Sequence, residues 1–149
     1  MNIEVKVDAK GLEQKLADFP VRLAAAQKRI LEYIGAAVQS RTTQAFRTAS
    51  VRPSPWAPRK PSKRDDGHPL LIRSGSLRQS ISWRIEGDDT VAVGSDRKYA
   101  AFHQHGTKKM PARPFFPVGP DGDLVPEMRR KIDREIARIF AEELGEAGG

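Results

Sequence analysis

The sequence of 149 residues contains no cysteine, which excludes disulfide bonds and thiolate metal sites and is consistent with a reducing compartment. Long apolar runs are also missing, since no stretch approaches the roughly 20 residues that a membrane-spanning helix requires. Residues 1–8 alternate charged and apolar side chains without the apolar centre of a signal peptide. Neither of the common glycine-rich phosphate-binding motifs is present. We therefore expect a protein that binds no cofactor and does not cross a membrane.

Acidic residues are missing from one long stretch. Between Arg41 and Arg64 the chain has seven basic residues and no acidic residue, which equals the whole formal net charge of +7. A positive surface attracts polyanions with an affinity that depends on salt, whereas the simpler interpretation is a solvated arm that keeps the protein soluble. If the stretch faces DNA or another polyanion, the candidate residues are Arg52, Arg59, Lys60, Lys63 and Arg64.

Hydrophobic periodicity predicts an α+β fold. Apolar residues at alternate positions predict strands at 3–7, 81–86 and 90–94, and a Gly-Asp-Asp turn joins the last two as a hairpin. Apolar residues three and four positions apart predict a long helix from Pro20 to Phe46, because proline suits the first turn of a helix. The same spacing predicts a shorter helical segment at 11–19 and a C-terminal helix from Leu124 to Leu144.

We expect both long helices to pack on a small antiparallel sheet. They would form a single domain over residues 1–149, with a frayed tail at 145–149. Among the aromatic residues, Trp83 and Phe102 are expected to lie in the core. The residues predicted to join the helices to the sheet are Ile30, Ile34, Val38, Trp83, Val91, Ile132 and Ile136.

Two proline-rich segments interrupt this pattern. Residues 48–67 are basic and poor in apolar side chains, which predicts a long extended arm with Trp56 as an anchor on the body of the protein or on a neighbour. Residues 111–117, Pro-Ala-Arg-Pro-Phe-Phe-Pro, predict a stiff strap, because each proline fixes its own φ and restricts the residue before it. Aromatic side chains in such loops can fill the core or anchor an interface. We predict subunit contacts for Trp56, Arg113, Phe115 and Phe116, with Arg113 bound to a carboxylate of the neighbour.

The candidates for metal binding are weak. His103 and His105 are two residues apart, a spacing that places both side chains on one side of a strand but not of a helix. No carboxylate cluster lies near them in the sequence. Asp88 and Asp89 occupy a hairpin turn, where adjacent carboxylates are typical turn formers. We therefore expect no metal site.

The candidates for catalysis are equally weak. Ser74, His68 and Asp65 include the residue types of a hydrolytic triad, but they lie in a proline- and glycine-rich region without a Gly-x-Ser-x-Gly elbow. Ser74 is better explained as the cap of a single helical turn. The sequence therefore does not predict an enzyme.

Five motifs follow one another in the middle of the chain, and together they resemble a known family. The motifs are Phe46 with Trp56-Ala57-Pro58, the run from Leu71 to Ile81, Val93-Gly94-Ser95, the run from Tyr99 to Gly106, and the run from Pro111 to Phe116. In this order they are similar to bacteriophage virion morphogenesis proteins of the Mu type and to the wider set of tail-completion and head–tail joining proteins. The resemblance covers roughly residues 46–117, and the flanking helices by type only.

The resemblance implies a non-enzymatic structural protein of a tailed phage or prophage. Such a protein acts at the head–tail joint of the virion, as a tail-completion, terminator-like or neck component, and is present in the host cytoplasm during assembly. Its implied partners are other head–tail connector and tail-tube proteins. It would form a homo-oligomeric ring, with a hexamer favoured, and make non-specific contact with DNA in the channel.

The alternative is a small basic nucleic-acid-binding protein. That class predicts tight binding to free duplex DNA, with an affinity that falls steeply as salt increases. A joint protein predicts weak DNA binding and self-association that depends on concentration.

Overall fold

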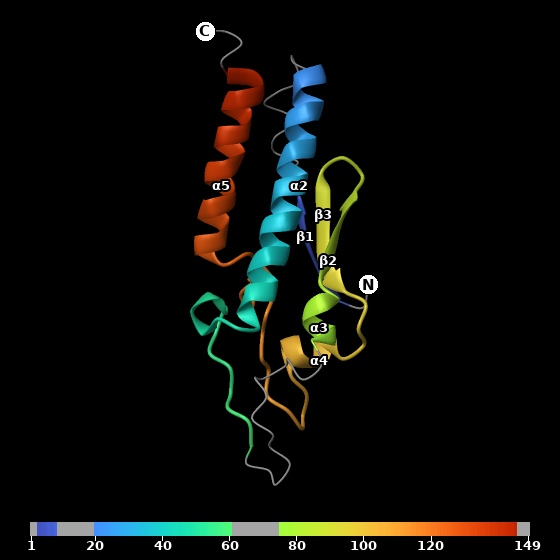
Figure 1. Cartoon of the computed structure of the whole chain (residues 1–149), viewed down its shortest axis with the longest axis vertical. Coiled ribbons are helices and arrows are strands. Elements are labelled where there is room, and N and C mark those ends of the chain that lie inside the picture. The colour runs from blue at the N-terminus through green and yellow to red at the C-terminus, as the bar shows by residue number, and fades with distance from the viewer. Residues whose placement is uncertain (1–2, 9–19, 61–74, 146–149) are drawn as a thin grey trace.

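The computed structural model describes residues 3–8, 20–60 and 75–145 (Figure 1). The expectations for the helical segment at 11–19 and for residues 61–67, 74 and 146–149 lie outside this part of the chain. The described strands are β1 (Ile3–Asp8), β2 (Ser82–Glu86) and β3 (Thr90–Ser95). The α-helices are α2 (Pro20–Ala45), α3 (Ser76–Gln79), α4 (Ala100–His105) and α5 (Pro126–Phe140), with a 3-10 helix at Ala49–Val51 and a π-helical turn at Ala141–Gly145.

The three strands form one antiparallel sheet in the order β1-β3-β2, so β3 is central. Val93 pairs with Val5 on one side and with Trp83 on the other. Because side chains alternate along a strand, these three residues share the face that packs against α2. The open face carries Glu4, Lys6, Arg84 and Glu86 instead, joined by ion pairs of 2.6–3.3 Å.

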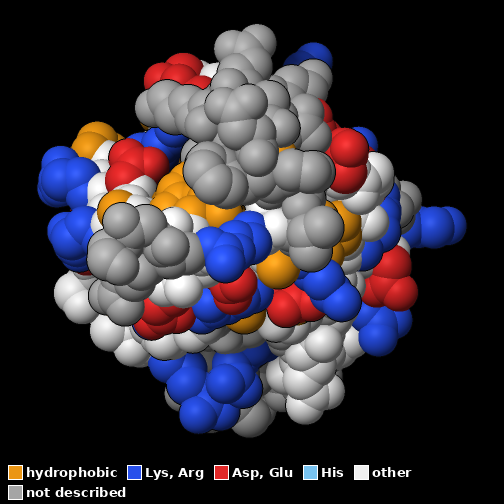
Figure 2. All heavy atoms as spheres, turned by 90° about the horizontal axis from the view of Figure 1, so that it is seen from above, with side chains coloured by type: hydrophobic (Ala, Val, Ile, Leu, Met, Phe, Trp, Pro, Cys, Tyr) orange, Lys and Arg blue, Asp and Glu red, His pale blue; other side chains and the backbone are white. Residues whose placement is uncertain are grey.

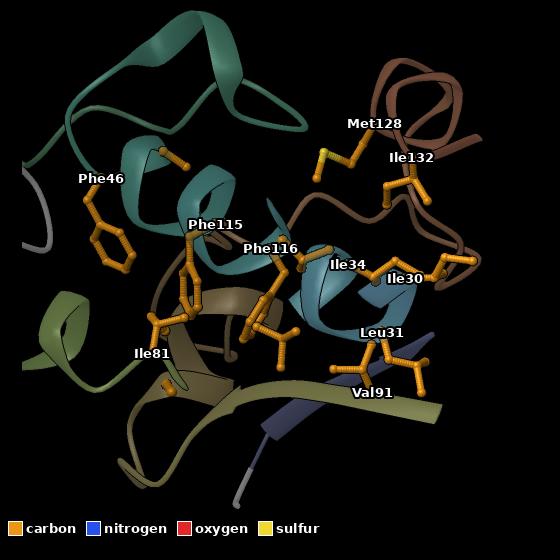
Figure 3. Close-up of a cluster of buried hydrophobic side chains, with 14 of the residues drawn as sticks. Ile30, Leu31, Ile34, Phe46, Ile81, Val91, Phe115, Phe116, Met128 and Ile132 are labelled. Carbon is orange, nitrogen blue, oxygen red and sulfur yellow. The ribbon is translucent and has the colours of Figure 1, made fainter. Parts of the chain in front are cut away.

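Helix α2 lies between the sheet and α5, as Figure 1 shows. Its buried positions recur every three or four residues, which produces a broad apolar stripe suited to a helix with partners on two sides. Figure 3 shows Ile30, Leu31 and Ile34 of α2 between Val91 of the sheet and Met128 and Ile132 of α5. None of the helices in the described ranges is long and apolar enough to cross a membrane.

Ion pairs attach both ends of the C-terminal region to α2. Arg41 pairs with Glu127 in the first turn of α5, at 3.0 Å. Arg29 pairs with Glu142 and Glu143 of the π-helical turn, each at 2.7 Å. These contacts flank the apolar contact between α2 and α5.

The α+β prediction is confirmed, with a long helix, a C-terminal helix and a small antiparallel sheet. The long helix begins at Pro20 as expected, and α5 begins at Pro126 rather than Leu124. Ile30, Ile34, Val38, Val91 and Ile132 are buried in the core, and Trp83 and Ile136 are half-buried against it. The prediction that Phe102 lies in the core is wrong, because this residue is 54% exposed.

The basic arm is described only in its first part. Residues 49–51 form a helical turn, and residues 52–60 contain neither helix nor strand.

At Gly35, helix α2 lies against Trp83 of the sheet with no room for a side chain. A Cβ atom at this position would lie 2.6 Å from Cε3 and 2.9 Å from Cγ of Trp83. Real Cβ atoms do not come that close to a ring, so the indole must move if the position is filled. Glycine is therefore retained in the middle of a helix despite its poor helix propensity.

We predict that Gly35→Ala destabilises the protein by about 1–3 kcal/mol through overpacking, although alanine is the better helix former by about 1 kcal/mol. Urea denaturation followed by circular dichroism measures the change. Ala36→Gly, at the exposed neighbouring position, is the matched control for propensity alone. A Gly35→Ala protein as stable as the wild type would show that Trp83 moves aside without cost.

Candidate assembly surface

The strap, residues 111–117, closes the core beneath the C-terminal end of α2. Phe115 and Phe116 are both 0% exposed. The ring of Phe115 lies 5.1 Å from that of Phe46 and 4.9 Å from that of Phe116, between ring centres. Figure 3 shows the three rings on the side of the core away from α5. The strap therefore contributes two of the largest side chains of the core.

The subunit contacts predicted for Phe115 and Phe116 are therefore corrected. A side chain without exposed area offers nothing to a neighbour, and truncating a buried phenylalanine typically costs about 3–5 kcal/mol of stability. The aromatic pair was open to both interpretations at the level of sequence, and burial within the subunit favours packing.

The backbone of the strap is held by α4. The side-chain oxygen Oε1 of Gln104 accepts hydrogen bonds from the backbone N–H groups of Phe115 and Phe116, at 2.9 and 3.2 Å. The N–H of Arg113 donates to the carbonyl of His103 at 2.7 Å. Buried N–H groups require such partners, so α4 fixes the course of the strap.

Sequence reasoning missed the role of Gln104. The signal available was its spacing, because Gln104 lies four residues after the apolar Ala100 and so shares the inward face of a short helix. Both residues are buried. A polar residue on a buried face must bond to something, and here it bonds to the strap.

The described part of the arm is bound to the strap in both directions. Nε1 of Trp56 donates to the carbonyl of Pro114 at 2.7 Å. In return, Arg113 donates to the carbonyls of Ala57 and Pro58, at 3.0 and 3.2 Å. Trp56 therefore anchors the arm to the body of its own subunit, and the guanidinium of Arg113 is used within the chain.

Arg52 is also used within the chain. Its guanidinium lies 3.6 Å from the centre of the Trp56 ring. It donates to the carbonyls of Ala45 and Phe46, at 2.6 and 3.4 Å, where the last carbonyls of α2 need partners. Burial lowers the pKa of Arg52 from its ordinary value. Of the other basic candidates, Arg59 and Lys60 are exposed, and Lys63 and Arg64 lie outside the described residues.

Basic and acidic side chains are mixed on two other parts of the surface. The open face of the sheet carries two basic and two acidic residues that pair with one another. Figure 2 shows the end of the molecule where α2 begins, and Lys and Arg side chains are interspersed there with Asp and Glu. Neither of these two surfaces concentrates positive charge.

The polar candidates for chemistry do not converge in the described ranges. No three His, Asp or Glu side chains come together there in a group that could hold a metal ion. The backbone of His103 bonds to the strap, and its Nδ1 atom is buried without a hydrogen-bond partner. Asp88 and Asp89 occupy the hairpin turn as expected. Asp65, His68 and Ser74 lie outside the described residues.

Comparison with known proteins identifies relatives of this chain. Residues 7–140 match the phage virion morphogenesis family. The curated protein described as Mu-like prophage FluMu G protein 1, from Haemophilus influenzae, is 40% identical over 77 residues, a match that covers 51% of this chain and 51% of the relative. The match thus spans about half the length of that relative. No solved structure matches the chain.

The bond from Gln104 to the strap yields a stability prediction. Gln104→Ala leaves two buried N–H groups without a partner, and each costs about 1–3 kcal/mol. We expect a loss of about 2–5 kcal/mol in urea denaturation. His105→Ala, at the exposed neighbouring position, should stay within about 0.5 kcal/mol of the wild type. A similarly small effect of Gln104→Ala would contradict the assignment.

The burial of His103 yields a pH prediction. Burial lowers the pKa of His103 below its ordinary 6.5, and the charge of Arg113 lowers it further. The unfolded chain therefore binds this proton more tightly than the folded chain, so the folded state loses stability as the pH falls through 6.5 toward the lowered pKa. Between about pH 7.5 and about pH 5.5, His103→Gln should lose less stability than the wild type.

Urea denaturation across that range tests the sign, with the exposed His105→Gln as control. Lys6 and Arg84 lower the pKa of Glu86 from its ordinary 4.5, so its contribution is lost only at more acid pH. Equal slopes for the wild type and His103→Gln would refute the prediction.

Proposed function

The chain belongs to the phage virion morphogenesis family, and from that membership we propose that it is a structural ring subunit at the head–tail joint. It acts there as a tail-completion, terminator-like or neck component. The observation that carries the proposal is the family match, which extends over residues 7–140 and so includes the strap, the β2–β3 hairpin and both long helices. A role in assembling a phage virion follows from the family, and the place at the joint is the proposed refinement.

The arrangement of the strap supports a structural role. The most chemically suggestive segment, His103-Gln104-His105, uses its backbone and its amide oxygen to hold the strap. Arg113 and Trp56 lock the first part of the arm to the same strap. These contacts hold α4, the strap and the first part of the arm together as one rigid region, which suits a component that must meet neighbours in one fixed geometry.

The proposed partners are further copies of this chain in a ring, of which a hexamer is the favoured form, together with connector and tail-tube proteins. DNA in the channel would make non-specific contact with exposed basic residues such as Arg59 and Lys60. The internal bonds of Arg52 weaken the alternative of a dedicated nucleic-acid-binding protein, because they engage one guanidinium of the basic stretch within the chain. That alternative would require tight binding to duplex DNA with a steep salt dependence.

The proposal predicts the phenotype of a gene deletion. In the phage or prophage that carries the gene, deletion should leave heads and tails that form separately but do not join, or tails of abnormal length. Electron microscopy of the lysate distinguishes these from complete particles, and the wild-type gene supplied in trans should restore joining.

A second complementation experiment tests whether the role is structural. A gene carrying His103→Gln and His105→Gln should also restore joining, provided that the protein folds. Deletion without effect on particle structure would refute the proposed function. Failure of a folded double variant would point to chemistry at the histidines instead.

A further inference from the structure

Two aromatic side chains face solvent at α4, Tyr99 as the residue that precedes the helix and Phe102 within it. Phe102 is 54% exposed and Tyr99 is 40% exposed, and the two lie three residues apart, on one side of the helix. The opposite side is buried through Ala100 and Gln104 and is tied to the strap. These rings, here called the knob, therefore cannot turn inward without breaking the bonds that hold Phe115 and Phe116.

The surroundings of the knob in the sequence are basic. Arg97 and Lys98 precede it, and Lys108 and Lys109 follow it, all four with exposed side chains. Asp96 is the one acidic residue between positions 96 and 109. An exposed aromatic pair flanked by basic residues is a typical centre of a protein contact with an acidic partner.

An apolar hollow lies beside the turn of the β2–β3 hairpin. Its volume is about 330 Å³, and its walls come from Ala24 and Leu31 of α2 and from Ile85 and Gly87 of the hairpin. Ile85 is 36% exposed. Gln27, which also lines the hollow, donates a hydrogen bond to the carbonyl of Asp88, so the hairpin turn is held to α2.

The hairpin turn beside the hollow is acidic. Asp88 lines the hollow opposite Lys28 of α2, and Asp89 follows Asp88 in the turn. The knob follows β3 and the hollow precedes it, so they lie at opposite ends of the sheet. Figure 1 shows the turn beside α2 and α4 beyond the other end of the strands. One molecule cannot bring them together.

We propose that Phe102 of one copy inserts into the hollow of the next copy, with Asp88 and Asp89 of the second copy facing Lys98 of the first. This inference rests on the proposed ring and names its contact. A knob and a hollow on different parts of one chain make a heterologous contact, which repeats from copy to copy and closes into a ring when the rotation permits. The occupant is a second copy because the chain itself carries both the knob, with basic residues around it, and the hollow, with an acidic turn beside it.

The first test disrupts the knob and the hollow in separate variants. Phe102→Asp removes the knob and keeps the hollow, whereas Ala24→Trp, at an exposed position of α2, fills the hollow and keeps the knob. By sedimentation over about a hundredfold range of concentration, each variant alone should self-associate at least about 30-fold more weakly than the wild type. A mixture of the two should form heterodimers that do not grow further, because only one intact pair remains.

Controls keep this result specific. Lys131→Glu, an exposed charge reversal on α5, should associate like the wild type. Circular dichroism should show all variants folded, as expected for substitutions at exposed positions. Wild-type affinity in Phe102→Asp would overturn the proposal, as would a mixture that forms no heterodimer.

A second test detects a contact too weak for sedimentation. Because the chain has no cysteine, single cysteines report contacts without background. Asp88→Cys and Lys98→Cys proteins, mixed under a mild oxidant, should form disulfide-linked heterodimers in excess over either homodimer. Adding Phe102→Asp to the Lys98→Cys protein should abolish that excess. No excess in the original mixture would overturn the proposal.

The outcome also separates this inference from the proposed function. If Phe102→Asp abolishes association in solution and the gene deletion leaves particles normal, the contact stands and the joint role fails. If deletion leaves heads and tails unjoined while Phe102→Asp restores joining fully, the joint role stands and this contact is wrong.

Discussion

The packing of the strap against the core depends on the side-chain oxygen of Gln104. The strap contains three prolines and has few N–H groups of its own, so it cannot pair as a strand. Two of those N–H groups bond to Gln104 and a third bonds to the carbonyl of His103. With these groups satisfied, Phe115 and Phe116 can enter the core without leaving buried donors unpaired. One amide side chain thus makes a proline-rich segment compatible with a packed interior.

The same bonds determine what the surface presents. Since the inward face of α4 is committed to the strap, its outward face must carry Tyr99 and Phe102, although exposure of such rings is unfavourable. Trp56 and Arg113 then fix the first part of the arm to the strap. The result is a surface on which the backbone of α4, and so the site from which Tyr99 and Phe102 project, is fixed by bonds within the subunit.

The charge of the chain serves more than one purpose. Arg52 stacks on Trp56 and binds the last carbonyls of α2, Arg41 pairs with α5, and Arg84 belongs to a neutral ion-pair group on the open face of the sheet. The ion pairs of Arg41 and Arg84 leave the net charge of +7 unchanged, because their acidic partners are already counted in it, whereas the guanidinium of Arg52 is held by carbonyls and a ring within the chain. Among the exposed basic residues are the four that flank Phe102 in the sequence: Arg97, Lys98, Lys108 and Lys109.

The sequence by itself determined the α+β class, the start of α2 at Pro20, the hairpin and the family, because periodicity, turn residues and motif order are local signals. The stiff strap and the extended arm stay predictions, whereas Trp56 does bind the first part of the arm to the strap. Only the tertiary structure decided which aromatic rings are buried. Phe115 and Phe116 were expected at an interface and lie in the core, while Phe102 was expected in the core and lies at the surface. Both reversals have one cause, the bonds from α4 to residues that follow it by about ten positions. No periodicity encodes such bonds, because the strap has no regular structure and its orientation depends on a partner in another element.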